Sequence, residues 1–248
     1  MSELRVGTSG WSYPNWKSRF YPPGLPQSGW FAYYAGRFDV VEINNSFYQF
    51  PKPETVAAWR EAAPLGFVYA VKANRYITHM KKLKAPEDAC LRFLAIVKEL
   101  RETLGPVLFQ LPPRWRYDGE RLAGFLRALP SGFRYAFEFR DPSWVNDHCL
   151  GLLADKGAAL CSTHLDGARV TGRAGADFAY FRLHGPEGPY QGRYGREGLA
   201  PWAEAIRKER EAGRAVYCFF DNDQEAFAAE DAAELAAMLG PPPPGGRS

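Results

Sequence analysis

Short apolar runs alternate along this chain with longer segments in which apolar residues recur every three or four positions. The runs are rich in Val, Phe, Tyr and Leu, which is typical of parallel strands buried on both faces. Eight such runs occupy positions 4–10, 40–47, 67–74, 106–113, 134–141, 158–165, 178–185 and 215–222. The pattern therefore predicts eight buried strands.

Helical periodicity fills most of the gaps between these runs. The segments that show it are 53–63, 85–105, 143–157, 199–213 and 224–240. The clearest is 85–105, where Pro86 stands in the first turn and Gly105 is expected to end the helix. Positions 166–177 have no helical period, so we expect a loop there.

Strands that alternate with helices predict an α/β fold, and eight such units predict a single closed (β/α)8 barrel, or TIM barrel. The helix of the sixth unit is expected to be replaced by the loop at 166–177. A doubly wound open sheet is the competing fold, but no GxGxxG follows the first run. We expect one domain over residues 1–240 and a disordered Pro/Gly-rich tail over 241–248.

The composition is that of an ordinary globular protein, with 46% hydrophobic and 24% charged residues in a chain of 248. The net charge of +3 is too small to argue for nucleic acid by itself. Four cysteines without a CxxC pair are expected to be buried, reduced thiols. The sequence shows no secretory leader pattern and no apolar run of roughly 18 residues, so we expect a cytoplasmic protein without a membrane partner.

The predicted strands are apolar at the start and polar at the end. Active sites of barrels form where the carboxyl ends of the strands meet, so these polar residues are expected to share one site. They are Thr8, Ser9, Glu42, Asn44, Lys72, Asn74, Gln110, Glu138, Arg140, His164, Asp166, Arg182, His184, Asp221 and Asn222. Pairs two residues apart, such as Glu42 with Asn44 and His164 with Asp166, are expected to share a strand face. The alternative is that these side chains only cap loops and pair with one another.

Seven longer motifs lie in order along the chain: GTSGWSYPNWKSRFYP, VEINNSFYQFP, VKANRYITH, LFQLPP, FEFRDPSW, FRLHG and CFFDND. Together they resemble the YecE-like family, whose domain is designated domain of unknown function 72 (DUF72). The resemblance covers nearly the whole chain and implies a TIM barrel. It makes the strand-end residues within these motifs the matching positions, and it implies no reaction.

The candidate catalytic residues are Glu138, Lys72, His184 and Glu42. Glu138 is the candidate general acid or base if burial raises its pKa, and the alternative is an ion pair with a neighbouring arginine. Glu42 and Lys72 end neighbouring strands and are expected to form an ion pair that keeps both charged. His184 is the second proton carrier. Lys72 could also form a Schiff base, but beside Glu42 its pKa would need another cause to fall.

The candidate substrate-binding residues are Trp11, Asn44, Asn74, Gln110, Arg140, Arg182, Arg193, Asp221 and Asn222. Guanidinium groups suit carboxylate or phosphate. The glycine-rich segment 184–198 carries Arg193 and follows the seventh strand, where barrels often bind phosphate. Aromatic residues crowd positions 10–31, and most are expected to pack as a cap, with Trp11 as the one that contacts substrate.

These residues favour an enzyme, a hydrolase or a lyase with carboxylate acid–base chemistry, that acts on a small anionic, phosphorylated ligand. One alternative is a nucleic-acid-binding or metal-dependent nuclease-like barrel, and another is a non-catalytic ligand-binding protein. No cofactor is predicted, and a divalent metal is the less favoured alternative because the basic side chains compete with it for the carboxylates. No protein partner is predicted.

Overall fold

The computed structural model describes residues 2–172 and 174–240, so the tail predicted at 241–248 lies outside the described residues. Its strands are β1 (Leu4–Thr8), β2 (Val40–Ile43), β3 (Val68–Lys72), β4 (Leu104–Gln110), β5 (Tyr135–Glu138), β6 (Ala159–Leu165), β7 (Ala168–Val170), β8 (Phe178–Leu183) and β9 (Ala215–Phe220). Its α-helices are α1 (Trp30–Ala35), α2 (Asn45–Tyr48), α3 (Pro53–Ala62), α4 (Ala89–Val97), α5 (Gly119–Ala128), α6 (Asp147–Lys156), α7 (Gly195–Glu211) and α8 (Phe227–Leu239). Shorter helical turns are η1 (Pro14–Trp16), η2 (Gln27–Gly29), η3 (Tyr76–Met80), η4 (Lys98–Thr103), η5 (Pro142–Trp144) and η6 (Gln224–Ala226).

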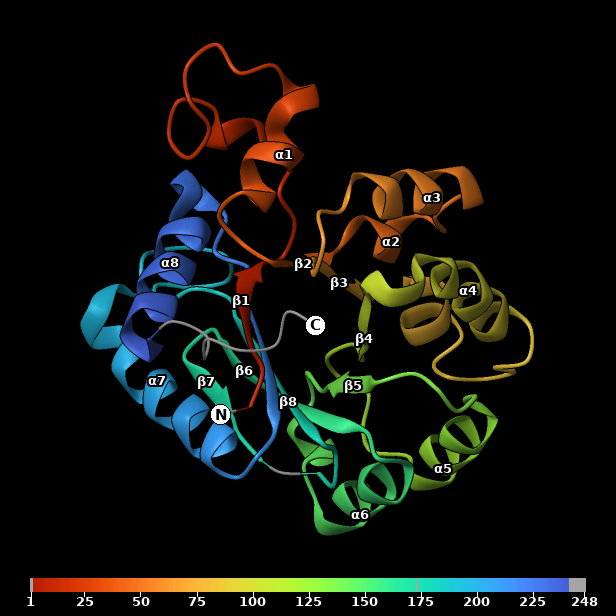
Figure 1. Ribbon diagram of the computed structural model, residues 1–248. Helices are drawn as coiled ribbons and strands as arrows, with labels where there is room; N and C mark the ends of the chain where they lie inside the picture. The colour runs from red at the N-terminus through yellow and green to blue at the C-terminus, as the bar shows by residue number, and fades with distance from the viewer. Residues whose placement is uncertain (1, 173, 241–248) are drawn as a thin grey trace.

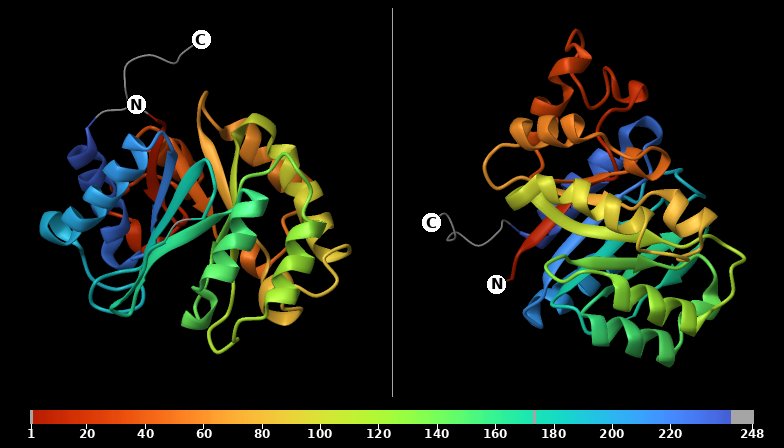
Figure 2. Two further views of the ribbon diagram at one scale, coloured as in Figure 1. Left: turned by 90° about the horizontal axis from the view of Figure 1, so that it is seen from below. Right: turned by 90° about the vertical axis from the view of Figure 1, so that its right-hand side faces the viewer.

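Within the described residues, eight strands close into a parallel barrel. They pair in the order β1-β2-β3-β4-β5-β6-β8-β9, and β9 pairs back onto β1. The helices surround this barrel, as the view along it shows (Figure 1), and the turned views show them flanking the strands (Figure 2). The predicted TIM barrel is therefore confirmed.

The sixth unit lacks the usual helix, as predicted. In its place, among the described residues after β6, the short strand β7 folds back antiparallel on β6, with His164 opposite Arg169. The chain then enters β8, which pairs with β6 in parallel. Gly167, at φ +73°, makes the tight turn between β6 and β7, which is a conformation that residues with a side chain rarely adopt.

Gly105 does not end a helix, contrary to the expectation from its position. The helical segment is α4 followed by η4, which ends at Thr103, and Gly105 is already the second residue of β4. A Cβ at Gly105 would lie 2.6 Å from Val68 Cγ1 and 3.2 Å from the carbonyl oxygen of Tyr69. The glycine is needed because β3 packs closely against this point, and not because the chain turns there.

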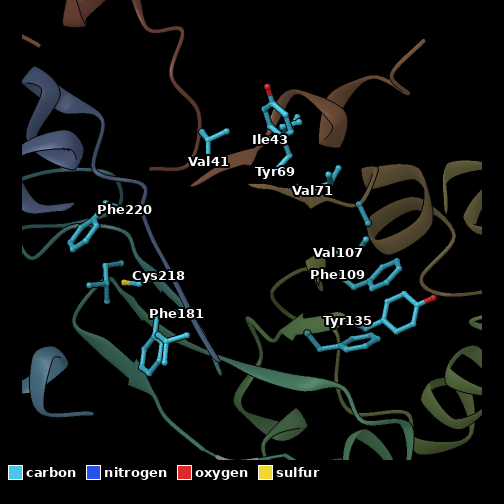
Figure 3. Packing of buried hydrophobic residues seen from close by; sticks show 14 of the residues in the cluster. Val41, Ile43, Tyr69, Val71, Val107, Phe109, Tyr135, Phe181, Cys218 and Phe220 are labelled. Carbon is cyan, nitrogen blue, oxygen red and sulfur yellow. The ribbon is translucent and has the colours of Figure 1, made fainter. Parts of the chain in front are cut away.

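Alternate side chains of the barrel strands point outward to the helices or inward to the barrel interior. The outward set packs under the helices and includes Val41, Ile43, Tyr69, Val71, Val107, Phe109, Tyr135, Phe181, Cys218 and Phe220 (Figure 3). The inward set is a second apolar cluster in which Ala70 and Ala136 leave space that the larger Tyr180 and Phe219 fill. The rings of Tyr180 and Phe219 lie 5.2 Å apart.

The aromatic residues between β1 and β2 pack as a cap, which confirms the expectation for most of them. The rings of Tyr21 and Trp30 stack at 4.6 Å, and Trp16 and Tyr21 are almost fully buried. This segment and α1 project beyond the rest of the helical layer (Figure 1). All four cysteines are buried and free, as the sequence predicted.

Candidate functional site

Polar side chains occupy the inward positions that follow the inner apolar cluster, at the carboxyl ends of the strands. Val40 is followed on the same face by Glu42, Ala70 by Lys72, and Tyr180 by Arg182. We call the resulting cluster the cup. It consists of Ser9, Glu42, Asn44, Lys72, Gln110, Glu138, Arg140, Arg182, His184 and Asp221.

Arg182 is the centre of the cup and is fully buried. Its Nη1 donates to Glu138 Oε2 at 2.7 Å, and its Nη2 donates to Glu42 Oε1 at 2.8 Å and to Asp221 Oδ2 at 2.9 Å. Its Nε also donates to Glu42 Oε1, at 3.1 Å. Three carboxylates from β2, β5 and the end of β9 therefore share one guanidinium group, which leaves it few donors for a ligand.

Glu42 is fully buried and its hydrogen bonds explain why a carboxylate ends a core strand. Besides Arg182, the hydroxyl of Ser9 donates to Oε1 at 2.9 Å and the hydroxyl of Tyr180 donates to Oε2 at 2.6 Å. Tyr180 belongs to the apolar layer directly below. Glu42 thus connects the hydrophobic interior of the barrel to the cup.

Glu138 is held ionised by two arginines. Its Oε1 lies 2.5 Å from Arg140 Nε, and its Oε2 lies 2.7 Å from Arg182 Nη1. Burial acts to raise the pKa of this carboxyl, but Arg140 and then Arg182 outweigh burial and hold the pKa well below its usual range. Glu138 therefore lacks the raised pKa that a general acid needs, and it forms ion pairs with two arginines, which was the alternative expectation.

His184 connects two of the carboxylates. Its Nδ1 lies 3.0 Å from Asp221 Oδ2, and its Nε2 lies 3.5 Å from Glu138 Oε1. Arg140 Nη2 is 3.2 Å from the same Nε2. Burial raises the pKa of Asp221, but Arg182 first and His184 second reverse this and leave the pKa lowered. His184 is fully buried, so its orientation is fixed by these contacts.

Lys72 does not pair with Glu42, contrary to the expectation from their neighbouring strands. Among the described residues, no carboxylate oxygen lies within 4.0 Å of Lys72 Nζ, because Glu42 is engaged by Arg182, Ser9 and Tyr180. Lys72 Nζ instead lies over the ring of Phe47, 4.4 Å from its centroid. Burial, and then the charge of Arg182, lower the pKa of Lys72 to about 8.

The motif VKANRYITH also brings His79 to this side of the cup, which our reasoning from strand ends missed. His79 lies in η3, and its ring contacts that of Phe47 at 5.0 Å. Burial, followed by the charges of Lys72, Arg75 and Arg140, lowers the pKa of His79 to about 4. Arg75 and His79 are both part of the motif VKANRYITH, but they lie beyond the last residue of β3. Only the turn η3 returns the chain towards the cup, so reasoning from strand ends did not find them.

Asn74, Gln110 and Asn44 differ in the hydrogen bonds that their side-chain amides form within the protein. Asn74 holds its own loop, because its Nδ2 donates to the carbonyl of Ser46 and its Oδ1 accepts from the backbone of Tyr76. Gln110 faces inward beside Glu138 and is nearly buried. Asn44 Nδ2 lies 3.3 Å from the Ser9 carbonyl oxygen, while its Oδ1 is buried and accepts no hydrogen bond from the described residues.

Asn222 and His164 are predicted strand-end residues that face the helices instead of the cup. Asn222 Nδ2 donates to the carbonyl of Gly192 and to Asp231 Oδ2, both at 2.8 Å, so it ties the segment after β8 to α8. His164 also points outward, where its Nδ1 lies 2.8 Å from the hydroxyl of Tyr194. Their runs have the expected polarity, but we placed these two residues on the wrong face.

Trp11 and Arg193 also lie away from the cup. The ring of Trp11 packs on Phe31 at 5.2 Å, in the aromatic cap. Arg193 is half exposed and pairs with Glu230 at 3.0 Å and Glu234 at 3.4 Å on α8. The glycine-rich segment 184–198 therefore does not direct Arg193 at the cup, because the acidic face of α8 holds this side chain.

The same segment does bring Tyr190 to the cup. The ring of Tyr190 lies 5.7 Å from that of His184, and its backbone N–H donates to the His184 carbonyl at 2.6 Å. Gly185, at φ +114°, makes this return possible, since a Cβ there would collide with the backbone of Gln191. Burial and then Asp221 raise the pKa of Tyr190.

Candidate metal ligands are not grouped for coordination. Among residues 2–172 and 174–240, no three His, Cys, Asp or Glu side chains are arranged so that they could hold a metal ion. The carboxylates of the cup point their oxygens at Arg182, as the distances above show. In the same part of the chain, no helix is long and apolar enough to cross a membrane.

Comparisons with known proteins agree with this architecture. Residues 5–246 match the family described as protein of unknown function DUF72. The chain is 33% identical to the UPF0759 protein YecE of Escherichia coli over 145 residues, which are 57% of this chain and 50% of YecE, so the match spans about half the length of that relative. It is 23% identical to the UPF0759 protein YunF of Bacillus subtilis over 95% of this chain and 94% of YunF.

Two solved structures share the fold. A DUF72 family protein from Thermotoga maritima superimposes with a TM-score of 0.85 at 27% identity, over 96% of this chain and 99% of that one. A DUF72 family protein from Enterococcus faecalis superimposes with a TM-score of 0.78 at 18% identity, over 95% of each chain. With the family match spanning nearly the whole barrel, the chain belongs to the DUF72 family.

Proposed function

We propose that this chain is an enzyme that acts on a small anionic substrate, with phosphate monoesters as the favoured class, and that the cup is its active site. The observation that carries the proposal is the burial of seven ionisable side chains at the carboxyl end of the barrel: Glu42, Lys72, Glu138, Arg140, Arg182, His184 and Asp221. Burying charges costs stability that an apolar cluster would not, and such clusters gather at functional sites.

The cationic side of the cup supports an anionic substrate. Burial, and after it the charges of Lys72, Arg75 and Arg140, lower the pKa of His79, so these three cationic side chains lie near its ring. Arg140 reaches Glu138 through Nε and His184 through Nη2, which are only part of its donors. In the proposal, Arg140, Arg75 and His79 hold the anion, whereas Arg182 positions the carboxylates and does not bind substrate.

Glu138 and His184 are the proton carriers of the proposal. An anion that pairs with Arg140 would weaken the attraction between Arg140 and Glu138 and place negative charge near that carboxylate. Both changes raise the pKa of Glu138 towards the range in which it can accept and return a proton. Asp221 holds His184 from the other side, at 3.0 Å, and so orients it towards Glu138.

The test combines binding and turnover on the intact protein. Melting temperatures are measured with inorganic phosphate, a panel of sugar phosphates and the matching uncharged sugars, because a ligand at a hundred times its Kd adds about 2.7 kcal/mol of stability. Phosphorus NMR of the same panel reports turnover. We expect phosphorylated compounds alone to raise the melting temperature, and Glu138→Gln to keep the shift but lose turnover. No shift with any phosphorylated compound would refute the anionic substrate, and unchanged turnover in Glu138→Gln would refute its role.

A second candidate function, binding of single-stranded nucleic acid, is supported by exposed aromatic residues around the cup. Tyr48, Tyr76 and Tyr190 are 71%, 37% and 45% exposed, and they follow β2, β3 and β8. Exposed rings can stack on bases. This function predicts that affinity for a short single-stranded DNA falls steeply with salt and is lost in Tyr48→Ala. Absence of salt-dependent binding would exclude it.

A further inference from the structure

Lys72 differs from the two arginines of the cup because, among the described residues, its ammonium group contacts no carboxylate. Arg182 contacts three carboxylates and Arg140 contacts Glu138 at 2.5 Å. Lys72 Nζ shares the same cup, yet in the described part of the chain no carboxylate oxygen lies within 4.0 Å of it. Its neighbour is instead the face of the Phe47 ring, and the residue is 8% exposed.

Arg182 is the reason for this arrangement. Glu42 directs one oxygen at Arg182 and Ser9 and the other at Tyr180. Glu138 and Asp221 direct theirs at Arg182 as well. These carboxylates contact a guanidinium group that cannot lose its own proton. They still raise the pKa of Lys72, but burial and the charge of Arg182 outweigh them. With a pKa of about 8, roughly a tenth of the Lys72 amines are neutral at pH 7.

We propose that Lys72 is a nucleophile that forms an imine with an aldehyde or ketone group of the substrate. This inference rests on the proposed function and specifies its substrate as an anionic carbonyl compound. A neutral, buried amine without an ion-pair partner is the form in which lysine attacks carbonyl carbon. Lys72 is 8% exposed, and the proposal takes this opening at the rim of the cup as the route by which a small carbonyl compound reaches it.

The step balances without any further reactant. The Nζ lone pair forms a bond to the carbonyl carbon, and one amine proton passes to the carbonyl oxygen, which gives a carbinolamine. The carbon–oxygen bond then breaks, and the oxygen leaves as water with both hydrogens that the amine has lost. Both protons therefore end on that water. The product is a carbon–nitrogen double bond at Lys72, which becomes an iminium ion when it takes up one proton.

An iminium ion at Lys72 would define the reaction class. It withdraws electrons from the neighbouring carbon, so a base can remove a proton from that carbon, or a carbon–carbon bond to it can break. Glu138, on β5 at the same end of the barrel, is the carboxylate that receives the proton. The chemistry is therefore that of a lyase or an isomerase of phosphorylated carbonyl compounds, within the acid–base chemistry already proposed.

Trapping with borohydride tests the proposal. The full chain is incubated at pH 7 with glycolaldehyde, which is uncharged, or with glyceraldehyde 3-phosphate, then reduced, digested and mapped by mass spectrometry. We expect at least tenfold more labelling at Lys72 than at the exposed Lys98 in the same molecule. Labelling of Lys72 should rise with pH around 8, as its ammonium group loses a proton. Equal or lower labelling at Lys72 with both aldehydes overturns the proposal.

Two outcomes of this experiment distinguish a failure of the imine proposal from a failure of the proposed function. If both aldehydes label Lys72 equally well, the imine stands and the preference for an anionic substrate fails. If phosphorylated compounds bind and turn over while Lys72 stays unlabelled, the proposed function stands and the imine fails. Lys72→Arg keeps the positive charge, so it should lose only the label at position 72, with labelling of Lys98 unchanged as the control for folding and reagent.

Discussion

Glu42 and Arg182 form a fully buried ion pair in which Glu42 Oε1 lies 2.8 Å from Arg182 Nη2 and 3.1 Å from Arg182 Nε. The pair joins β2 to β8, which lie apart in the barrel order with β1 and β9 between them. Removing one partner of such a pair leaves a buried charge without full compensation, which is more costly than the pair itself is favourable. The pair therefore connects two strands that are not neighbours in the barrel, and it holds Arg182 in place at the centre of the cup.

Glu42→Gln is expected to lower the free energy of unfolding by about 3–5 kcal/mol, because Arg182 keeps its charge and loses a carboxylate. Urea denaturation at pH 7 measures the change. The matched control is Glu225→Gln, which breaks an exposed pair with Arg19 of 3.0 Å and should cost less than about 1 kcal/mol. Equal losses in the two variants would contradict the central role of the buried pair.

Acid should destabilise the protein through Glu138 and Asp221. The pKa values of both carboxyls are lowered in the folded chain, so the unfolded chain binds protons first as the pH falls below about 4.5. The stability that they supply is fully present above that pH and is lost as the pH falls through the folded pKa values. Unfolding measured from pH 7 to pH 3 should show a shallower loss in Glu138→Gln. An identical pH profile in this variant would show that Glu138 does not contribute to the loss of stability in acid.

Lys72→Met should stabilise the protein at pH 7, by about 1 kcal/mol or more, since it removes a buried charge without a carboxylate partner. The pKa of Lys72 falls from 10.5 when unfolded to about 8 when folded, so the wild type should gain stability between pH 8 and pH 10.5. Denaturation at pH 7 and pH 10 measures both effects. A Lys72→Met variant that is less stable than the wild type at pH 7 would mean that the ammonium group has a stabilising partner.

Arg140→Gln should abolish the rise in melting temperature that phosphate monoesters cause, because Arg140 supplies the guanidinium on the cationic side of the cup. Arg193→Gln is the matched control, since Arg193 pairs with α8 and lies away from the cup. We expect the control to keep the full shift. Loss of the shift in Arg193→Gln, with Arg140→Gln unaffected, would move the anion site to the segment after β8.

Asn222→Ala should loosen the segment after β8 at a cost of about 1–3 kcal/mol, because it removes the Asn222 donor from the buried carbonyl of Gly192 and one of the donors to Asp231 Oδ2, which keeps the Tyr194 N–H. Hydrogen exchange of residues 185–194 should accelerate, while exchange in α6 stays unchanged. Faster exchange throughout the chain would instead indicate global destabilisation.

The sequence by itself determined the barrel and the composition of its polar end. Continuous apolar runs need burial on both faces, and eight of them that alternate with helical segments predict a closed parallel sheet inside a helical layer. The end of each run then carries its polar residues to one side, so Glu42, Lys72, Glu138 and Arg182 could be assigned to one site. The missing sixth helix was equally visible, because 166–177 has no helical period.

Only the tertiary structure decided which of these side chains meet. Strand β6 puts odd-numbered residues inside the barrel, so His164 faces a helix, whereas His184 lies in the cup. Glu42 pairs with Arg182 across the barrel and not with Lys72 on the adjacent strand. The guanidinium group of Arg182 contacts three carboxylates at once. Distances between strands that are remote in sequence are set by how the barrel closes, and that information is absent from any local pattern. The charge state of Lys72, on which the proposed chemistry depends, therefore follows from the fold and not from the sequence around it.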